Sequence, residues 1–137
     1  MRMLAGRCMC GAVEYAVADD FLYAANCHCT RCRAMTGSAF KAFAGIATGK
    51  LTVTQGGEAL FVFGTAERGD MRCGRCGSFL YSTLGERVHV AMGSLVDTPT
   101  IRPKEHIFVA SKAGWFEITD DLPQYAGHVF EGPPINR

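Results

Sequence analysis

The stretch Cys73-Gly74-Arg75-Cys76-Gly77 decides how this chain folds, because its two cysteines have the spacing of a zinc knuckle. Thiolates bind tetrahedral zinc at about 2.3 Å, so two on one ion must lie close together, and the glycines permit the tight turn this requires. Cys8-Met9-Cys10 offers a second pair, since residues i and i+2 of an extended chain point to the same side. Together the pairs predict a saturated structural zinc site that contributes to folding, with the ligands Cys8, Cys10, Cys73 and Cys76.

The other three cysteines lie within the segment Cys27-His28-Cys29-Thr30-Arg31-Cys32. Three protein ligands leave the fourth position of a zinc ion for water or substrate, which is the usual catalytic arrangement. We therefore predict Cys27, Cys29 and Cys32 as the ligands of a catalytic zinc. A fourth protein ligand would instead close the site. His106 is a better candidate for it than His28, because neighbouring side chains of an extended chain diverge.

Two arginines, Arg31 and Arg33, flank this middle cluster. They could balance the negative charge of a zinc trithiolate or attract an anionic substrate, and a solvated basic turn explains them equally well. Trp115 is expected in the core rather than at a stacking surface.

The remaining sequence is typical of a mainly-β protein. Val13, Tyr15 and Val17 alternate with other side chains as in a half-buried strand, and turn residues at Leu84-Gly85-Glu86 predict a hairpin. Further strands are predicted over residues 21–26, 40–46, 51–54, 58–63, 78–83, 87–92, 106–111 and 115–119.

Helix is predicted only at Thr30–Met35, where Thr30 could cap its start and Gly37 its end. The residues from about 120 onward contain three prolines and are expected to be an irregular tail. We predict one domain over residues 1–137.

Composition indicates the compartment in which the protein is expected and one class of partner that is not expected. An odd count of seven cysteines argues against a disulfide framework, and no apolar signal or membrane-spanning run is present, so a reducing cytoplasm is expected. Fourteen basic residues against thirteen acidic ones give a net charge of +1, which argues against a general nucleic-acid binder.

The order of these motifs resembles the glutathione-dependent formaldehyde-activating enzyme family, to which centromere protein V is also similar. The resemblance extends over Gly6–Tyr15, Cys27–Arg33, Thr36–Ser38, Cys73–Gly77, His106–Ile107, Lys112–Trp115 and Asp121–Tyr125. It implies a β-tent (Mss4-like) zinc-binding fold, with the four-cysteine site structural and the three-cysteine site catalytic.

The same resemblance implies addition of glutathione to formaldehyde, giving S-hydroxymethylglutathione, by an enzyme classed as a carbon–sulfur lyase. We therefore expect two zinc ions per chain, the catalytic one labile, and a small thiol such as glutathione as partner. The alternative is a non-catalytic zinc module that binds a protein partner, and a thiol redox or metal-trafficking protein is a third reading.

Overall fold

The computed structural model describes residues 1–136, which form two compact units. The first unit contains Met1–Tyr23 and Ala44–Ile101, and the second contains Ala24–Phe43 and Arg102–Arg137. The expectation of one domain over the whole chain stays a prediction. No helix among the described residues has the length and apolar character needed to cross a membrane.

The protein is mainly β with little helix, which confirms the predicted fold class. Its strands are β1 (Met3–Arg7), β2 (Glu14–Ala18), β3 (Tyr23–Cys27), β4 (Lys41–Ala47), β5 (Leu51–Gln55), β6 (Leu60–Gly64), β7 (Gly69–Cys73), β8 (Phe79–Leu84), β9 (Arg87–Ala91) and β10 (His106–Ile107). The α-helix is α1 (Thr30–Thr36), and short 3-10 turns are η1 (Thr48–Lys50), η2 (Gly57–Ala59), η3 (Met92–Ser94) and η4 (Val109–Ser111).

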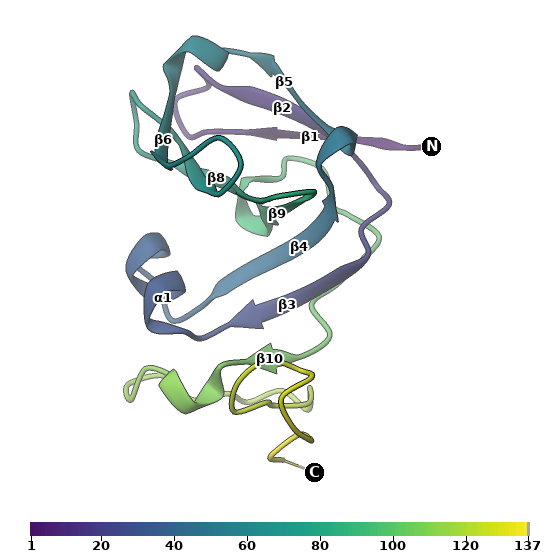
Figure 1. The fold of residues 1–137 in the computed structure, drawn as a ribbon, viewed down its shortest axis with the longest axis vertical. Helices are drawn as coiled ribbons and strands as arrows, with labels where there is room; N and C mark the ends of the chain where they lie inside the picture. The colour runs from purple at the N-terminus through teal and green to yellow at the C-terminus, as the bar shows by residue number, and fades with distance from the viewer. Residues whose placement is uncertain (137) are drawn as a thin grey trace. The chain divides into compact units, whose positions relative to one another are not determined.

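The first unit contains two antiparallel arrangements. Strands β1, β2 and β5 form a three-stranded sheet (Figure 1). Strands β6, β7, β8 and β9 pair in sequence order as an antiparallel meander. The alternation seen in the sequence buries Tyr15 and Val17 on one face of β2, where they pack with Leu4 and Leu80 in the core of this unit. This packing brings the chain around Cys8 and β7 into one core, since Cys8 and Cys73 belong to the same cluster.

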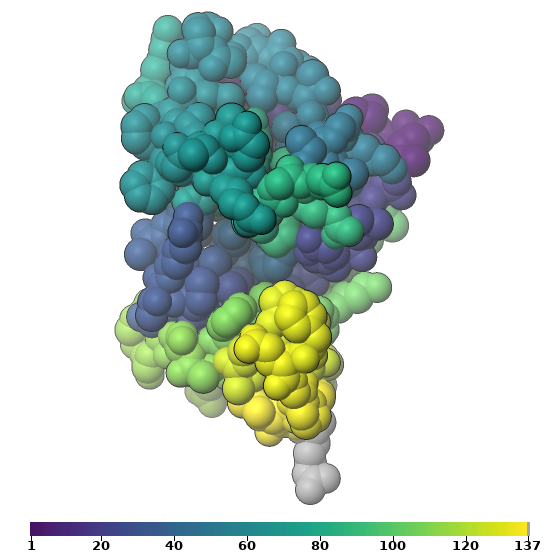
Figure 2. Space-filling model, in the orientation of Figure 1, coloured from purple at the N-terminus to yellow at the C-terminus, as the bar shows by residue number. Residues whose placement is uncertain are grey.

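The second unit is built around the middle cysteines. Strand β3 ends at Cys27, the chain then turns into α1, and β10 lies parallel to β3 with Ile107 opposite Cys27 (Figure 1). From residue 120 onward the described chain has a single β-bridge, at Gln124, and no helix. The last described residues gather in one patch, yellow in Figure 2, and the Ile135 N–H donates to the Gln124 carbonyl.

Four sequence-based expectations were wrong in detail. Residues 115–119 form no strand, and the strand predicted over 106–111 ends at Ile107. Helix α1 is capped by Cys29, whose sulfur accepts a hydrogen bond from the Cys32 N–H, rather than by Thr30. Its C-terminal cap is Gly37, as predicted. Trp115 is 70% exposed, so its expected place in the core is wrong.

Strands β1 and β7 were not predicted. The five residues of β1 include a glycine and an arginine, and β7 begins with glycine and aspartate, so neither shows a clear alternation. Both are identified only by their pairing with β2 and with β6 and β8.

Candidate metal centres

Four sulfurs of the first unit form a tight group. The Sγ atoms of Cys8, Cys10, Cys73 and Cys76 all lie within 4.8 Å of one another, and all four cysteines are free thiols. Cys10 Sγ lies 3.7 Å from Cys8 Sγ and 3.7 Å from Cys73 Sγ. Zinc–sulfur bonds of about 2.3 Å give a regular tetrahedron with edges of about 3.8 Å, whereas a disulfide needs about 2.05 Å. The spacing of the donors therefore fits a tetrahedral metal ion and no disulfide.

The two cysteine pairs are shaped alike. Each is followed by a glycine in the left-handed region, Gly11 with φ 81° and Gly77 with φ 81°. In the second pair the Gly77 N–H donates to the Cys73 carbonyl at 2.8 Å, which closes the turn. A side chain at these positions would be strained, so the glycines let each turn present two sulfurs to one point.

The electrostatics of this group favour a cation. A hydrogen bond with the Ser78 hydroxyl, together with the Ser78 N–H, lowers the pKa of Cys76 to about 5. At Cys10 the Ala12 N–H lowers the pKa, but burial and the neighbouring thiols raise it on balance to about 11. Four thiolates in so small a space repel one another, and a bound divalent cation would relieve that repulsion.

The second group of sulfurs lies in the second unit. The Sγ atoms of Cys27, Cys29 and Cys32 lie within 4.8 Å of one another, and no histidine, carboxylate or further cysteine in residues 1–136 joins them. Cys27 and Cys32 are buried, whereas Cys29, at the start of α1, is partly exposed. The three donors therefore fit a metal ion with one position left for a guest, which would approach from the side of Cys29.

A buried lysine that the sequence patterns did not indicate stabilises the negative charge of these thiolates. Lys41 begins β4 and is only 7% exposed. The pKa of Cys32 is lowered to about 6 by its hydrogen bond with Cys27 and, against the effect of burial, by the charge of Lys41. The signal available in the sequence was a lysine within the apolar run 40–46, where a buried charge needs a partner.

His28 and His106, considered above as fourth ligands, form a buried pair instead. His28 is 0% exposed and His106 is 2% exposed, and His28 Nε2 lies 2.8 Å from His106 Nδ1. His106 Nε2 lies 2.9 Å from the nearer carboxylate oxygen of Asp120. Both ring nitrogens of His106 are thus engaged away from the sulfurs, and His106 Nε2–H donates to Asp120 while His106 Nδ1 accepts from His28 Nε2–H.

Burial keeps His28 neutral. Burial lowers the pKa of His28 to about 4, and the nearby positive charges of Lys112 and Arg33 act in the same direction. His106 in turn lowers the pKa of Asp120, which stays a carboxylate. His28 Nδ1 is left as a buried lone pair without a hydrogen-bond partner.

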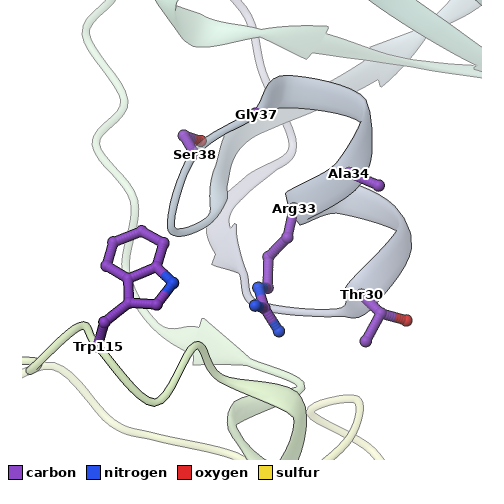
Figure 3. Close-up of a pocket in the computed structure, with 6 residues that line it drawn as sticks. All are labelled: Thr30, Arg33, Ala34, Gly37, Ser38 and Trp115. Atoms are coloured by element: carbon purple, nitrogen blue, oxygen red, sulfur yellow. The ribbon is translucent and has the colours of Figure 1, made fainter.

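An open pocket of about 350 Å³ lies beside α1. It is lined by Thr30, Arg33, Ala34, Gly37, Ser38 and Trp115. Figure 3 shows the Trp115 indole on the far side of the pocket from α1, turned toward the Arg33 side chain. Arg33 Nη1 donates to the Ser111 carbonyl at 3.0 Å, which holds the guanidinium at this place.

Comparison with known proteins shows similarity to one family model, to a curated relative and to a solved structure. The family model described as "Glutathione-dependent formaldehyde-activating enzyme" matches residues 3–111. A Halomonas elongata protein named for the same family is 30% identical in an alignment of 128 positions, which covers 85% of this chain and 81% of that protein. The crystal structure of a Rhodobacter sphaeroides protein is similar with a TM-score of 0.55 and 28% identity, over 70% of this chain and 91% of that one.

Proposed function

The chain belongs to the glutathione-dependent formaldehyde-activating enzyme family, and from this premise we propose that it is a zinc enzyme that joins a small thiol to an aldehyde. In reverse the same enzyme cleaves the carbon–sulfur bond of the adduct, as a carbon–sulfur lyase does. The β-tent (Mss4-like) fold expected from the family resemblance agrees with the mainly-β structure and with the solved relative.

Two zinc ions per chain are proposed, with different tasks. Cys8, Cys10, Cys73 and Cys76 would hold a structural ion, because four thiolates saturate it. Cys27, Cys29 and Cys32 would hold the catalytic ion. The observation that carries the proposal is that these three sulfurs come together without a fourth protein donor, with Cys29 partly exposed.

The reaction moves one proton and forms one bond. The thiol sulfur attacks the aldehyde carbon, the carbonyl π bond opens, and the proton that leaves sulfur ends on the new hydroxyl. Zinc at the three-cysteine site would lower the pKa of an incoming thiol, so that the nucleophilic thiolate exists near neutral pH.

The surrounding residues hold this site in shape. Lys41 offsets the negative charge of the three thiolates from within the protein. The hydrogen-bonded chain from Asp120 through His106 fixes the ring of His28, which stands between two of the ligands in the sequence. These residues therefore position Cys27 and Cys29 rather than react themselves.

Glutathione and formaldehyde are the first substrates to examine, because the family is named for them. Seven free thiols, with no pair at disulfide distance, are suited to a reducing cytoplasm, which we propose as the compartment.

The test is a screen of thiol–aldehyde pairs with zinc-loaded protein, following adduct formation by NMR against the spontaneous rate. We expect acceleration for at least one pair, two zinc ions per chain by elemental analysis, and loss of activity in Cys29→Ser with one zinc fewer. Thr54→Ser, an exposed substitution on β5, is the control for effects of mutation and purification that are unrelated to the site. Fully loaded protein that accelerates no pair would contradict the proposal and favour the non-catalytic zinc module.

A further inference from the structure

We propose that the pocket beside α1 binds a carboxylate of the thiol substrate through Arg33, with Trp115 covering the bound molecule. Arg33 would then be the residue by which the site favours a thiol that carries a carboxylate over a neutral thiol. This inference rests on the proposed function for the reaction, but the binding it describes can be measured without turnover.

The pocket lies next to the three-cysteine group in the sequence and on the same helix. Thr30 and Arg33 line it, and each directly follows a cysteine of the catalytic group, Cys29 and Cys32. Cys29 is also the member of that group that solvent reaches. A thiol whose sulfur approaches from this side would have the rest of its body beside α1. A volume of about 350 Å³ suits part of a small ligand.

The charge of the pocket is the second argument. Arg33 is half-buried, and its recorded hydrogen bond is to the neutral Ser111 carbonyl. No carboxylate among residues 1–136 forms an ion pair with Arg33, and none of the residues that line the pocket is acidic. A guanidinium has five N–H donors in a planar fork that matches a carboxylate, so most of its donors stay available for an anionic ligand.

The exposed tryptophan is the third argument. Trp115 is 70% exposed, and it contacts Phe116 edge to face, with ring centroids 6.4 Å apart. In Figure 3 its indole lies on the side of the pocket opposite α1. A large aromatic side chain at the rim of a pocket gains burial when a ligand packs against it, which is how such residues stabilise complexes.

The kinetic test compares three thiols with one aldehyde: glutathione, N-acetylcysteine and the neutral N-acetylcysteamine. We expect Arg33→Gln to lower kcat/KM for the two carboxylate-bearing thiols by about 10- to 100-fold, and for the neutral thiol by less than about threefold. Arg31→Gln is the matched control, because Arg31 is exposed, flanks the same cysteines and does not line the pocket. Equal losses for charged and neutral thiols in Arg33→Gln would overturn the inference.

The binding test uses S-methylglutathione, which has both carboxylates but no free thiol. Trp115 is the only tryptophan of the chain, so its fluorescence reports on this pocket alone. We expect a saturable change in the wild type, in Arg31→Gln and in Cys29→Ser, and its loss in Arg33→Gln. An unchanged response in Arg33→Gln, or no response in the wild type, would overturn the inference. A response that depends on Arg33 in a protein that turns over no thiol would support it while contradicting the proposed reaction.

Discussion

At the scale of residues, the surroundings of the middle cluster show how side chains far apart in sequence fix the protonation and orientation of one another. The Asp120 carboxylate accepts a hydrogen bond from His106 Nε2–H, and His106 Nδ1 accepts one from His28 Nε2–H. A single half-exposed acid therefore determines which nitrogen of each buried ring carries the proton. His28 stands between two sulfur ligands and also donates its backbone N–H to the Ile107 carbonyl at 2.9 Å. We infer that this chain of hydrogen bonds steadies the three-cysteine group.

Asp120→Ala tests that role. Removal of the acceptor frees the His106 ring, and we expect zinc to leave the three-cysteine site a few times faster, with release from the four-cysteine site unchanged. The loss of stability should be about 1 kcal/mol or less, because the Asp120 side chain is 48% exposed and its contacts are weakened by water. A colorimetric chelator measures both phases of release. Asp121→Ala, at an exposed neighbour, is the control, and equal release rates in both variants would argue against the positioning role.

At the scale of elements, β1 and β2 are held in register by a glycine under an aromatic ring. Gly6 lies opposite Tyr15, and a Cβ built on Gly6 would stand 2.0 Å from the tip of the Tyr15 ring. The ring is buried, and its hydroxyl lies 2.6 Å from Ser94 Oγ, so it has no room to move aside. Close contact across the pair therefore depends on the absence of a side chain at Gly6.

Gly6→Ala should accordingly destabilise the protein by about 1–3 kcal/mol through overpacking. Gly49→Ala is the matched control, since a Cβ at Gly49 has no atom within 4 Å. Urea unfolding of the zinc-loaded variants measures the difference between them. Equal stability of the two would mean that β1 shifts away from β2 at little cost.

Residues 115–119 show why an alternating pattern is not enough for a strand. Residues 116–119 alternate in polarity, but a strand also needs a partner with free backbone groups. Strand β10 is bonded to β3 on one side and bridged to Gln124 on the other, so neither edge remains open to residues 115–119. The segment instead carries Trp115 to the rim of the pocket.

At the scale of the whole molecule, the two cysteine groups belong to different units of the chain, which predicts different consequences of their loss. The four-cysteine group joins the N-terminal residues to β7 within the core of the first unit. Cys73→Ser should therefore reduce soluble yield and abolish a cooperative thermal transition, because metal binding there is folding energy. Cys29→Ser should stay folded by circular dichroism. Similar melting of both variants would contradict a division into structural and catalytic sites.

A chelator should remove the two metal ions of the wild type one after the other. With increasing chelator we expect the three-cysteine site to lose zinc first, since three protein ligands hold an ion less firmly than four. Activity should then disappear while the far-ultraviolet circular dichroism is kept, and unfolding should follow only at higher chelator concentration. Simultaneous loss of activity and structure would show that the two ions are not separable. Zinc analysis at each step measures the order directly.

The sequence by itself determined the mainly-β character of the protein, the position of α1 and the sorting of the sulfurs into groups of four and three. These features depend on spacing over a few residues, since a knuckle, a capped helix or an alternating strand is local geometry. That the pair Cys8 and Cys10 lies close to the pair Cys73 and Cys76 could also be inferred. Each pair supplies only two of the four ligands that a tetrahedral ion needs.

Only the tertiary structure decided which other side chains surround the sulfurs. The contact of His28 with His106 joins residues 78 positions apart, and the Arg33 to Ser111 hydrogen bond does the same. Lys41 lies near Cys32 because of how β4 begins, and Trp115 stands at the pocket because residues 115–119 find no strand to pair with. Such contacts depend on strand register and on the path of the loops, which local periodicity does not encode.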